Sequence, residues 1–301
     1  MISSRVLLAL ALGALSAQAI PSLKTRQSIT TLSTNQIETY KPYTWYASTA
    51  YCAPANTLAW NCGTNCQANP TFKPIASGGD GDETQYWYVG YDPTLKTIIV
   101  AHQGTDTSEL LADLTDGDIV YSSLDPTLFP GVPSSVEAHD GFQGTQSRSA
   151  AGVLAGVQSG ISKYGATQVT VVGHSLGAAI ALLDSIYLPL HLPSNIGVKF
   201  IGYGLPRVGN QAFANYVDAN AAKVPVTHIN NMEDPIPICP GMFLGYVHPS
   251  GEIHIQDSGS WDACPGQDNG SDLCIVGDVP YIWDGDESNH DGPYDGVTMG
   301  C

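Results

Sequence analysis

One stretch of the chain, residues 169–187, constrains its fold more than any other. It reads VTVVGHSLGAAIALLDSIY, so β-branched residues lead into GHSLG at 173–177 and an Ala/Leu/Ile-rich segment follows without a break. The first part has the composition of a buried strand and the last part that of a helix. The sequence therefore predicts a strand that turns sharply into a helix, with glycine at both ends of the turn because side chains there would collide with neighbouring backbone.

The same turn makes Ser175 a candidate nucleophile. A turn this tight holds the serine hydroxyl out at the carboxyl end of the strand, in front of the free N–H groups of the first helical turn. Those N–H groups can stabilise an oxyanion, which an acyl-transfer nucleophile requires. A bare G-x-S-x-G also arises by chance, so the interpretation depends on whether the chain supplies partners for this serine.

Strands and helices alternate around this stretch. Residues 51–84 are rich in Cys, Asn, Gly and Pro and are predicted as loop with at most short strands, and residues 36–46 as a helix on the surface. We further expect strands at 85–91, 95–101, 198–203 and 226–229, and helices at 144–164 and 210–221. This alternation predicts a single α/β domain whose central, mostly parallel sheet is flanked by helices.

The N-terminus has the features of a secretory signal. Residues 1–19 hold one basic residue, then an apolar run too short to span a bilayer comfortably, and end in the small-x-small pattern Ala-Gln-Ala. We expect a signal peptide at 1–19, a short pro-segment at 20–26 and one domain at 27–301. The protein is thus expected to be secreted and extracellular, with no integral membrane segment.

The chain is strongly acidic. It has 28 Asp and Glu against 11 Lys and Arg, a formal net charge of −17 at pH 7. Such a surface argues against binding to nucleic acid and against electrostatic docking on anionic membranes. The cysteines show no zinc-binding spacing, and we expect no metal, no other cofactor and a monomeric protein.

Seven cysteines in a secreted chain indicate disulfides with one thiol left over. Spacing alone leaves the connectivity open. Two pairs would bracket short loops and a third would join the two ends of the domain: Cys62–Cys66, Cys264–Cys274 and Cys52–Cys301. Cys239 is then the candidate free thiol. The one N-glycosylation sequon begins at Asn269.

A nucleophilic serine needs an imidazole to accept its proton and a carboxylate to orient that imidazole. In α/β hydrolases the acid and then the histidine follow the serine in the chain. Asp234 directly follows the strand predicted at 226–229, and His290 lies in a loop near the C-terminus rich in glycine and acids. The other downstream histidines are placed in a Pro-rich turn, inside a strand and on both sides of an expected hairpin: His191, His228, His248 and His254.

A long segment without clear periodicity, 106–136, follows the strand at 95–101. Residues 107–114 begin like a helix with Thr107 as N-cap, and their leucines form a narrow apolar stripe. An apolar excursion beside a candidate site suggests a movable cover. An ordinary surface helix followed by a fixed loop is the alternative.

Ordered matches along most of the chain resemble the fungal class 3 lipase family. IVAHQGT at 99–105 is similar to its oxyanion strand, GHSLG at 173–177 to its nucleophile turn and YGLPRVGN at 203–210 to its Y-G-x-P-R-x-G-N. Further matches are the cysteine segment at 50–52, HDGF at 139–142, the acid loop NMEDPIP at 231–237, His248, His290 and Cys301.

The resemblance implies an α/β-hydrolase fold with a lid at 106–118, and a secreted enzyme that cleaves acylglycerol esters, most typically a triacylglycerol lipase, through an acyl-serine intermediate. In such an enzyme Ser175 is the nucleophile, Asp234 the orienting acid and His290 the general base. Thr105 and Leu176 would form the oxyanion hole. The resemblance also implies the pair Cys52–Cys301 and structural roles for three other histidines: His139, His174 and His248.

Two departures from the family bear on the substrate. Gln103 stands where the family usually has arginine, so an ion pair near the lid is absent. The lid is acidic and has only a thin leucine stripe, which weakens the case for strong interfacial activation; its acids are Glu109, Asp113, Asp116 and Asp118. A feruloyl or short-chain carboxylesterase acting on soluble esters therefore stays open, with a non-catalytic binding protein on a hydrolase scaffold as a more distant alternative.

Overall fold

The computed structural model describes residues 28–115 and 120–301. The expected signal peptide and pro-segment lie outside the described residues, as do lid positions 116–118. The described part contains a nine-stranded sheet. From one edge to the other its strands are β1 (Thr30–Thr31), β13 (Trp261–Cys264), β12 (Glu252–Ile255), β10 (Val226–Asn231), β8 (Gly197–Tyr203), β7 (Gln168–His174), β4 (Thr97–His102), β3 (Trp87–Asp92) and β2 (Lys73–Gly78).

The centre of this sheet is parallel and its edges are antiparallel. β12, β10, β8, β7 and β4 pair in parallel, whereas β13 and β1 at one edge and β3 and β2 at the other pair antiparallel. The expected mostly parallel sheet of an α/β hydrolase is therefore confirmed for its centre. A smaller sheet in the described residues consists of β11 (Tyr246–Val247), β9 (Gly209–Asn210), β6 (Glu137–His139) and β5 (Tyr121–Ser123).

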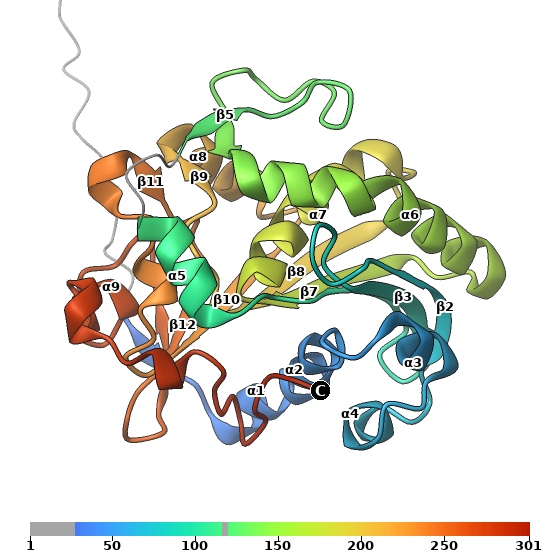
Figure 1. Cartoon of the computed structure of the whole chain (residues 1–301), viewed down its shortest axis with the longest axis horizontal. Helices are drawn as coiled ribbons and strands as arrows, with labels where there is room; N and C mark the ends of the chain where they lie inside the picture. Colours follow the sequence, from blue (N-terminus) through green and yellow to red (C-terminus); the bar gives the residue numbers. More distant parts are fainter. Residues whose placement is uncertain (1–27, 116–119) are drawn as a thin grey trace, which may run out of the picture.

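Helices cover both faces of the main sheet (Figure 1). On one face lie α6 (Asp140–Tyr164), α7 (Leu176–His191) and α8 (Gln211–Asn220). On the other lie α1 (Thr34–Glu38), α2 (Lys41–Thr49), α3 (Pro54–Ala59) and α4 (Thr64–Ala68). The remaining helical segments are α5 (Thr107–Thr115), α9 (Ile275–Asp278) and the single turns η1 (Ile236–Ile238), η2 (Met242–Leu244), η3 (Ile282–Asp284) and η4 (Glu287–Asn289).

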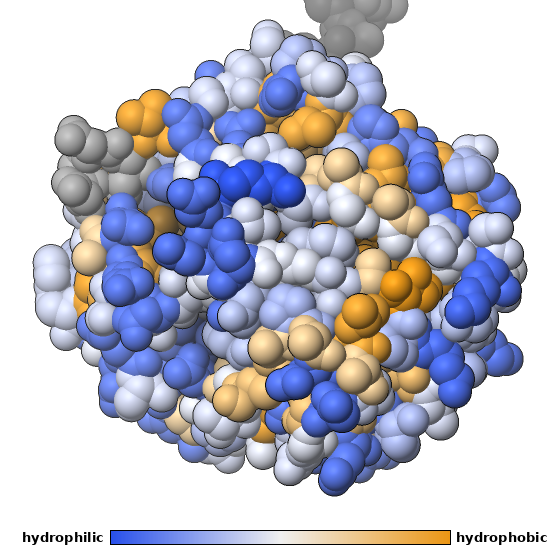
Figure 2. All heavy atoms as spheres, turned by 45° about the vertical axis from the view of Figure 1, so that its right-hand side comes forward, coloured by the Kyte–Doolittle hydropathy of each residue, from blue (hydrophilic) through white to orange (hydrophobic). Residues whose placement is uncertain are grey.

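The core has two halves because successive strand residues point to opposite faces. In β4, Ile98 and Val100 belong to the cluster packed against α6 and α7, while Ile99 and Ala101 belong to the cluster packed against α2. All four side chains are fully buried. Burial on both faces explains the uninterrupted apolar strands in the sequence. On the outside, hydrophilic residues cover most of the face in Figure 2, and apolar residues occur there in small groups.

The N-terminal third departs from the predictions. The helix expected at 36–46 is two helices, and α2 is buried rather than superficial because Tyr43 and Tyr46 pack under the sheet. Residues 51–84, predicted as loop with at most short strands, form the short strand β2 but also the helices α3 and α4, which were not predicted. Proline at the first position of α3 and the Cys62–Cys66 disulfide at α4 stabilise turns of helix too short to show a hydrophobic period.

Two local predictions, a helix cap and a hairpin, were wrong as well. Asp106, not Thr107, caps α5: its carboxylate accepts hydrogen bonds from the N–H groups of Ser108 (3.0 Å) and Glu109 (3.3 Å). Helix α7 continues through Pro189 to His191, since proline so near the end removes only one hydrogen bond of the last turns. The hairpin expected around residues 248–254 does not form, because β11 pairs with β9 in the small sheet and β12 pairs with β10 and β13 in the large one.

Candidate active site

The turn between β7 and α7 has the strained backbone that the sequence predicted. Ser175 adopts φ 60° and ψ −132°, a region that non-glycine residues rarely occupy. A Cβ at Gly173 would lie 2.2 Å from the carbonyl oxygen of Gly177, and a Cβ at Gly177 would lie 2.3 Å from that of His102. Only glycine at both positions therefore allows this turn.

Asp234 and His290 form a buried pair. The imidazole Nδ1 of His290 lies 2.8 Å from Oδ2 of Asp234, and both side chains are almost completely buried. The other carboxylate oxygen accepts a hydrogen bond from the N–H of Ile236 (2.9 Å). In the tautomer whose Nδ1–H donates to this carboxylate, Nε2 presents a lone pair.

Tyr203 and Gly204, at the end of β8, lie next to both Ser175 and the Asp234–His290 pair. The N–H of Ser175 donates to the carbonyl of Tyr203 (2.9 Å). A Cβ on the next residue, Gly204, would lie 2.8 Å from Cε1 of His290 and 3.1 Å from Oδ2 of Asp234. Neither Oγ of Ser175 nor Nε2 of His290 has a hydrogen-bond partner among the described residues, although both atoms are buried. A serine hydroxyl and an imidazole lone pair are thus left free in one buried region.

Two tyrosines and His174 support the loop that carries His290. Tyr51 donates its hydroxyl proton to Nδ1 of His174 (2.6 Å), and Nε2 of His174 donates to the carbonyl of His290 (2.8 Å). The hydroxyl of Tyr294 donates to the same carbonyl (2.9 Å). Burial first, and the neighbouring His290 second, hold the pKa of His174 well below its ordinary value, so this ring is a neutral structural group. Tyr51 lies in the matched segment at 50–52, but its partner is 123 residues away, and nothing local indicated the contact.

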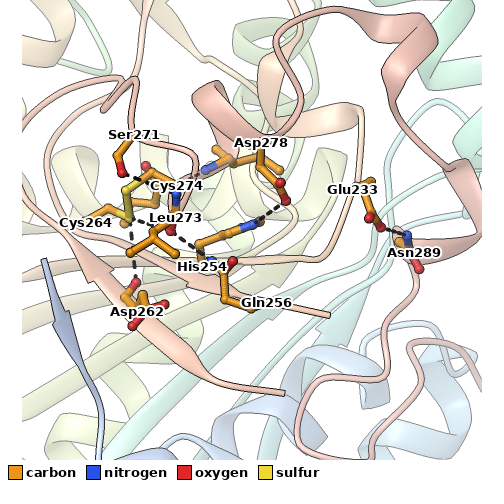
Figure 3. Close-up of polar contacts among 12 residues, drawn as sticks. Glu233, His254, Gln256, Asp262, Cys264, Ser271, Leu273, Cys274, Asp278 and Asn289 are labelled. Atoms are coloured by element: carbon orange, nitrogen blue, oxygen red, sulfur yellow. Dashed lines mark hydrogen bonds and ion pairs between the residues drawn. A yellow bond between two sulfur atoms is a disulfide. The ribbon is translucent and has the colours of Figure 1, made fainter. Parts of the chain in front are cut away.

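A second missed set of side chains joins the acid loop to the histidine loop. Asn231 donates to the carbonyl of Asn289 (2.9 Å), and the amide of Asn289 donates to the carboxylate of Glu233 (2.9 Å; Figure 3). The N–H of Asp286 donates to the carbonyl of Glu233 (2.8 Å). These bonds fix the distance between the segments that carry Asp234 and His290. Each of them spans more than fifty residues, so spacing in the sequence gave no signal.

The two residues expected to form an oxyanion hole lie beside Ser175. Leu176 is the first residue of α7, so its N–H has no acceptor within the helix. A Cβ at Gly104 would lie 2.9 Å from Cβ of Ser175, which shows how closely the loop after β4 approaches the serine. Thr105 follows in that loop and lines an open cleft of about 610 Å³ that also includes Asp106.

Helix α5 follows the loop that carries Thr105, and its leucines are buried. Leu110 and Leu114 are 3% and 1% exposed and belong to the same apolar cluster as Leu205 and Ile236, whereas the acidic residues of α5 are exposed. Ser175 and His290 are 0% exposed. The leucine stripe thus faces inward, as in a closed cover. Gln103, at the base of this segment, accepts a hydrogen bond from the N–H of Tyr86 (2.9 Å) and braces β3.

Arg207 holds the backbone that follows Asp234. Its guanidinium donates to the carbonyls of Ile238 and Pro240, the latter at 2.9 Å, and to Oδ1 of Asp268 at 2.7 Å. Oδ2 of Asp268 accepts from the N–H of His248 (2.8 Å). The Arg207 and Asp268 side chains are 2% and 3% exposed. The disulfide-closed loop at 264–274 thereby reaches the acid loop through one ion pair.

The disulfides are Cys52–Cys301, Cys62–Cys66 and Cys264–Cys274, the pairs that we expected, and Cys239 is a buried free thiol whose pKa burial raises to about 12. In the part of the chain that the structure describes, the one cluster of metal-ligand residue types is Glu252 with Cys264 and Cys274. Its two sulfurs are joined in the disulfide drawn in Figure 3, so they offer no thiolate to a metal.

Comparisons with known proteins agree with this geometry. The model of the family "Lipase (class 3)" matches residues 99–244. A secreted mono- and diacylglycerol lipase of Gibberella zeae is 32% identical over 232 residues, which are 74% of this chain and 70% of that protein. The chain belongs to the class 3 lipase family.

Two further comparisons concern a secreted relative and a solved structure. A secreted mono- and diacylglycerol lipase of Malassezia globosa is 34% identical over 201 residues, 63% of this chain. That match covers 66% of the Malassezia protein's length, slightly under two thirds. The solved structure of a triacylglycerol lipase with a serine-protease triad superposes with a TM-score of 0.76 at 26% identity, over 90% of this chain and 98% of the other. None of the helices in the described residues is both long and apolar enough to cross a bilayer.

Proposed function

We propose that this class 3 lipase is a secreted serine hydrolase that cleaves the carboxylic esters of acylglycerols. The observation that carries the proposal is the Asp234–His290 pair, joined at 2.8 Å, together with a strained Ser175 whose hydroxyl has no partner among the described residues. The relatives named as secreted mono- and diacylglycerol lipases support the substrate class and the extracellular location.

In the proposed mechanism Ser175 attacks the ester carbonyl while Nε2 of His290 takes the hydroxyl proton. Asp234 holds the ring with Nδ1–H toward it and stabilises the imidazolium that forms. The N–H groups of Leu176 and Thr105 receive the negative charge on the carbonyl oxygen. His290 then protonates the departing alcohol, and a water molecule activated by the same ring hydrolyses the acyl-serine. The steps use side-chain and backbone groups of this chain together with the substrate and one water molecule, and no cofactor takes part.

The nucleophile is tested by replacing Ser175 with alanine. We expect S175A to lose at least a thousandfold in kcat on p-nitrophenyl butyrate, since losing the nucleophile removes the covalent path and leaves only binding and oxyanion stabilisation. The protein should also form a covalent adduct with a serine-directed phosphonate, and S175A should not. S147A, which changes an exposed serine of α6, is the matched control and should keep both properties. Full activity in S175A would show that another residue is the nucleophile.

The substrate is tested by comparing emulsified monoolein, diolein and triolein with methyl ferulate. Hydrolysis of the oleins is expected, because the inner face of α5 is apolar and suits acyl chains rather than a phenolic ring. A marked preference for methyl ferulate would favour the feruloyl esterase alternative instead. Absence of turnover on all four, with no phosphonate adduct, would favour a non-catalytic binding protein.

Three further properties belong to the same proposal. The protein acts as a monomer, since every group in the mechanism comes from one chain; size-exclusion chromatography with light scattering tests this. The lid comprises residues 106–118 and exposes its leucines when it opens. Asn269 carries a glycan when the chain passes through a secretory pathway, which a mass shift on enzymatic deglycosylation would reveal. The half-buried amide of Asn269 donates to the carbonyl of Pro265 (2.9 Å), a bond that a glycan would have to replace.

A further inference from the structure

A second groove lies at the opposite end of the central strands from Ser175. It has a volume of about 600 Å³ and runs between the last turns of α7, the loop at 192–196 and the end of α8. Gln168, the first residue of β7, lines it, whereas the last residue of β7 is adjacent to Ser175. Six residue steps along a strand separate these ends by about 20 Å, so the groove is no part of the candidate active site at Ser175, which we call the acyl site.

The walls of this groove are mainly apolar. Ile186 and Leu190 line one side from α7, Val217 lines the other from α8, and Ile196 and Val198 belong to the connection and the strand between them. A volume between roughly 300 and 1,000 Å³ with apolar walls and few polar groups is typical of sites for small molecules. Uncharged residues with polar groups line the groove as well: Gln168, Ser185, Ser194, Asn195, Tyr216 and Asn220. Its apolar side chains suit contact with a flexible hydrocarbon chain.

The charge of the groove is unusual for this chain. Asp and Glu residues number 28, but none of them is among the residues that line the groove, and the one charged lining residue is Lys223. Lys223 is exposed and takes part in no ion pair within the described residues. The cleft beside Thr105, in contrast, is lined by Asp106, Glu287 and Asp291. An anion would be repelled at that cleft and attracted at the groove.

We propose that the groove between α7 and α8 binds the anion of a long-chain fatty acid. The acyl chain lies against Ile186, Leu190 and Val217, and the carboxylate lies at the rim beside the ammonium group of Lys223. A single cation at the end of an apolar channel matches the one charge and the hydrocarbon tail of such an amphiphile. The ligand class coincides with the acid released by the proposed hydrolysis, but binding at this groove requires no catalysis.

The test is photolabelling with a 16-carbon fatty acid that carries a diazirine near its methyl end, on the S175A variant. After irradiation, adducts are mapped by peptide mass spectrometry. We expect adducts in residues 185–198 and 216–224, and we expect excess oleate to abolish them. Adducts confined to the lid helix α5 and to the first turn of α7 would overturn the proposal, because they would place the acid in the acyl site alone.

Charge reversal tests the headgroup contact. K223E should weaken oleate competition at the groove about five- to tenfold, since an attractive exposed pair becomes a repulsive one. K73E changes charge equally at an exposed lysine of β2, far along the sheet order, and should have no effect. Equal weakening by both variants would contradict the proposed contact, because the effect would then come from the net charge of the protein and not from Lys223. Oleyl alcohol competing as well as oleate would equally exclude recognition of the carboxylate.

Chain length tests the apolar contact. From octanoate to myristate, each added methylene that is buried should strengthen competition about fourfold. An affinity independent of chain length would refute burial of the chain. None of these measurements requires turnover. An inactive protein would therefore refute the proposed hydrolysis, while binding of the fatty acid in the groove could still be tested. K223E is expected to keep wild-type hydrolysis of p-nitrophenyl butyrate, which reports on the distant acyl site.

Discussion

The buried ion pair between Arg207 and Asp268 makes the most demanding prediction for stability. Asn in place of Asp268 keeps the shape of the side chain but removes its charge, while Arg207 stays 2% exposed with only carbonyl oxygens around it. Removing one partner of a buried pair leaves an uncompensated charge, which costs about 3–5 kcal/mol. For a domain of this size that loss corresponds to a fall in Tm of roughly 10 °C.

The measurement is thermal and urea unfolding of D268N, with disulfides intact, next to D272N as a control. Asp272 is exposed and belongs to the same disulfide-closed loop, so its loss of charge should change stability by less than about 0.5 kcal/mol. The double variant R207M/D268L should recover only part of the loss: no charge then remains buried, but the carbonyls of Ile238 and Pro240 and the N–H of His248 lose their partners. Equal stabilities of D268N and D272N would refute this reasoning.

The same pair predicts a dependence on pH. Burial would raise the pKa of Asp268, but neighbouring positive charge and the hydrogen bonds from Arg207 and His248 outweigh it, and the pKa lies below its ordinary value. A lowered folded pKa contributes stability that is present above the unfolded pKa of about 3.9 and is lost as pH falls through the folded pKa. The difference between the protein and D268N should therefore be full above about pH 4 and shrink below it. A difference that grows on acidification would contradict the assignment.

Three other changes have clear expected outcomes. D234N should lower kcat on p-nitrophenyl butyrate about ten-thousandfold, because an amide can hold His290 in the wrong tautomer, and thermal unfolding should show that the fold survives. Burial raises the pKa of Glu252 to about 7, above its unfolded value, so the stability of the protein should fall as pH rises from about 4.5 to 7. The E252Q variant keeps the hydrogen bond from the N–H of Ile275; it should remove that fall and be more stable than the unchanged protein by up to roughly 3 kcal/mol at pH 8. The same pH profile in E252Q as in the unchanged protein would argue against this role of Glu252. L114A should loosen the closed position of α5 and raise kcat/KM on soluble butyrate esters severalfold, whereas an unchanged value would mean that α5 does not limit access.

Much of the fold followed from local patterns. The apolar strands 98–101 and 169–172 and the long helix ending at Tyr164 were predicted because burial imposes a period on the sequence that can be counted. The short helices α3 and α4 escaped prediction, since five or six residues are too few to show such a period. The buried position of α2 was missed because its tyrosines and small polar residues look amphipathic, although tertiary packing covers them.

The sequence by itself determined the turn at Ser175, and it supplied Asp234 and His290, in that order, as the partners that we propose for it. Glycine at 173 and 177 is a requirement of local backbone geometry, and local geometry can be inferred from neighbouring residues. The tertiary structure decided which groups support these residues. Tyr51 hydrogen-bonds to His174, Asn231 donates to the loop that carries His290, and Asp268 pairs with Arg207. Each of these contacts joins residues more than fifty positions apart, where chain spacing carries no information about distance. The groove beside Lys223 likewise exists only because the last turns of α7 and the end of α8 lie near the start of β7 and β8.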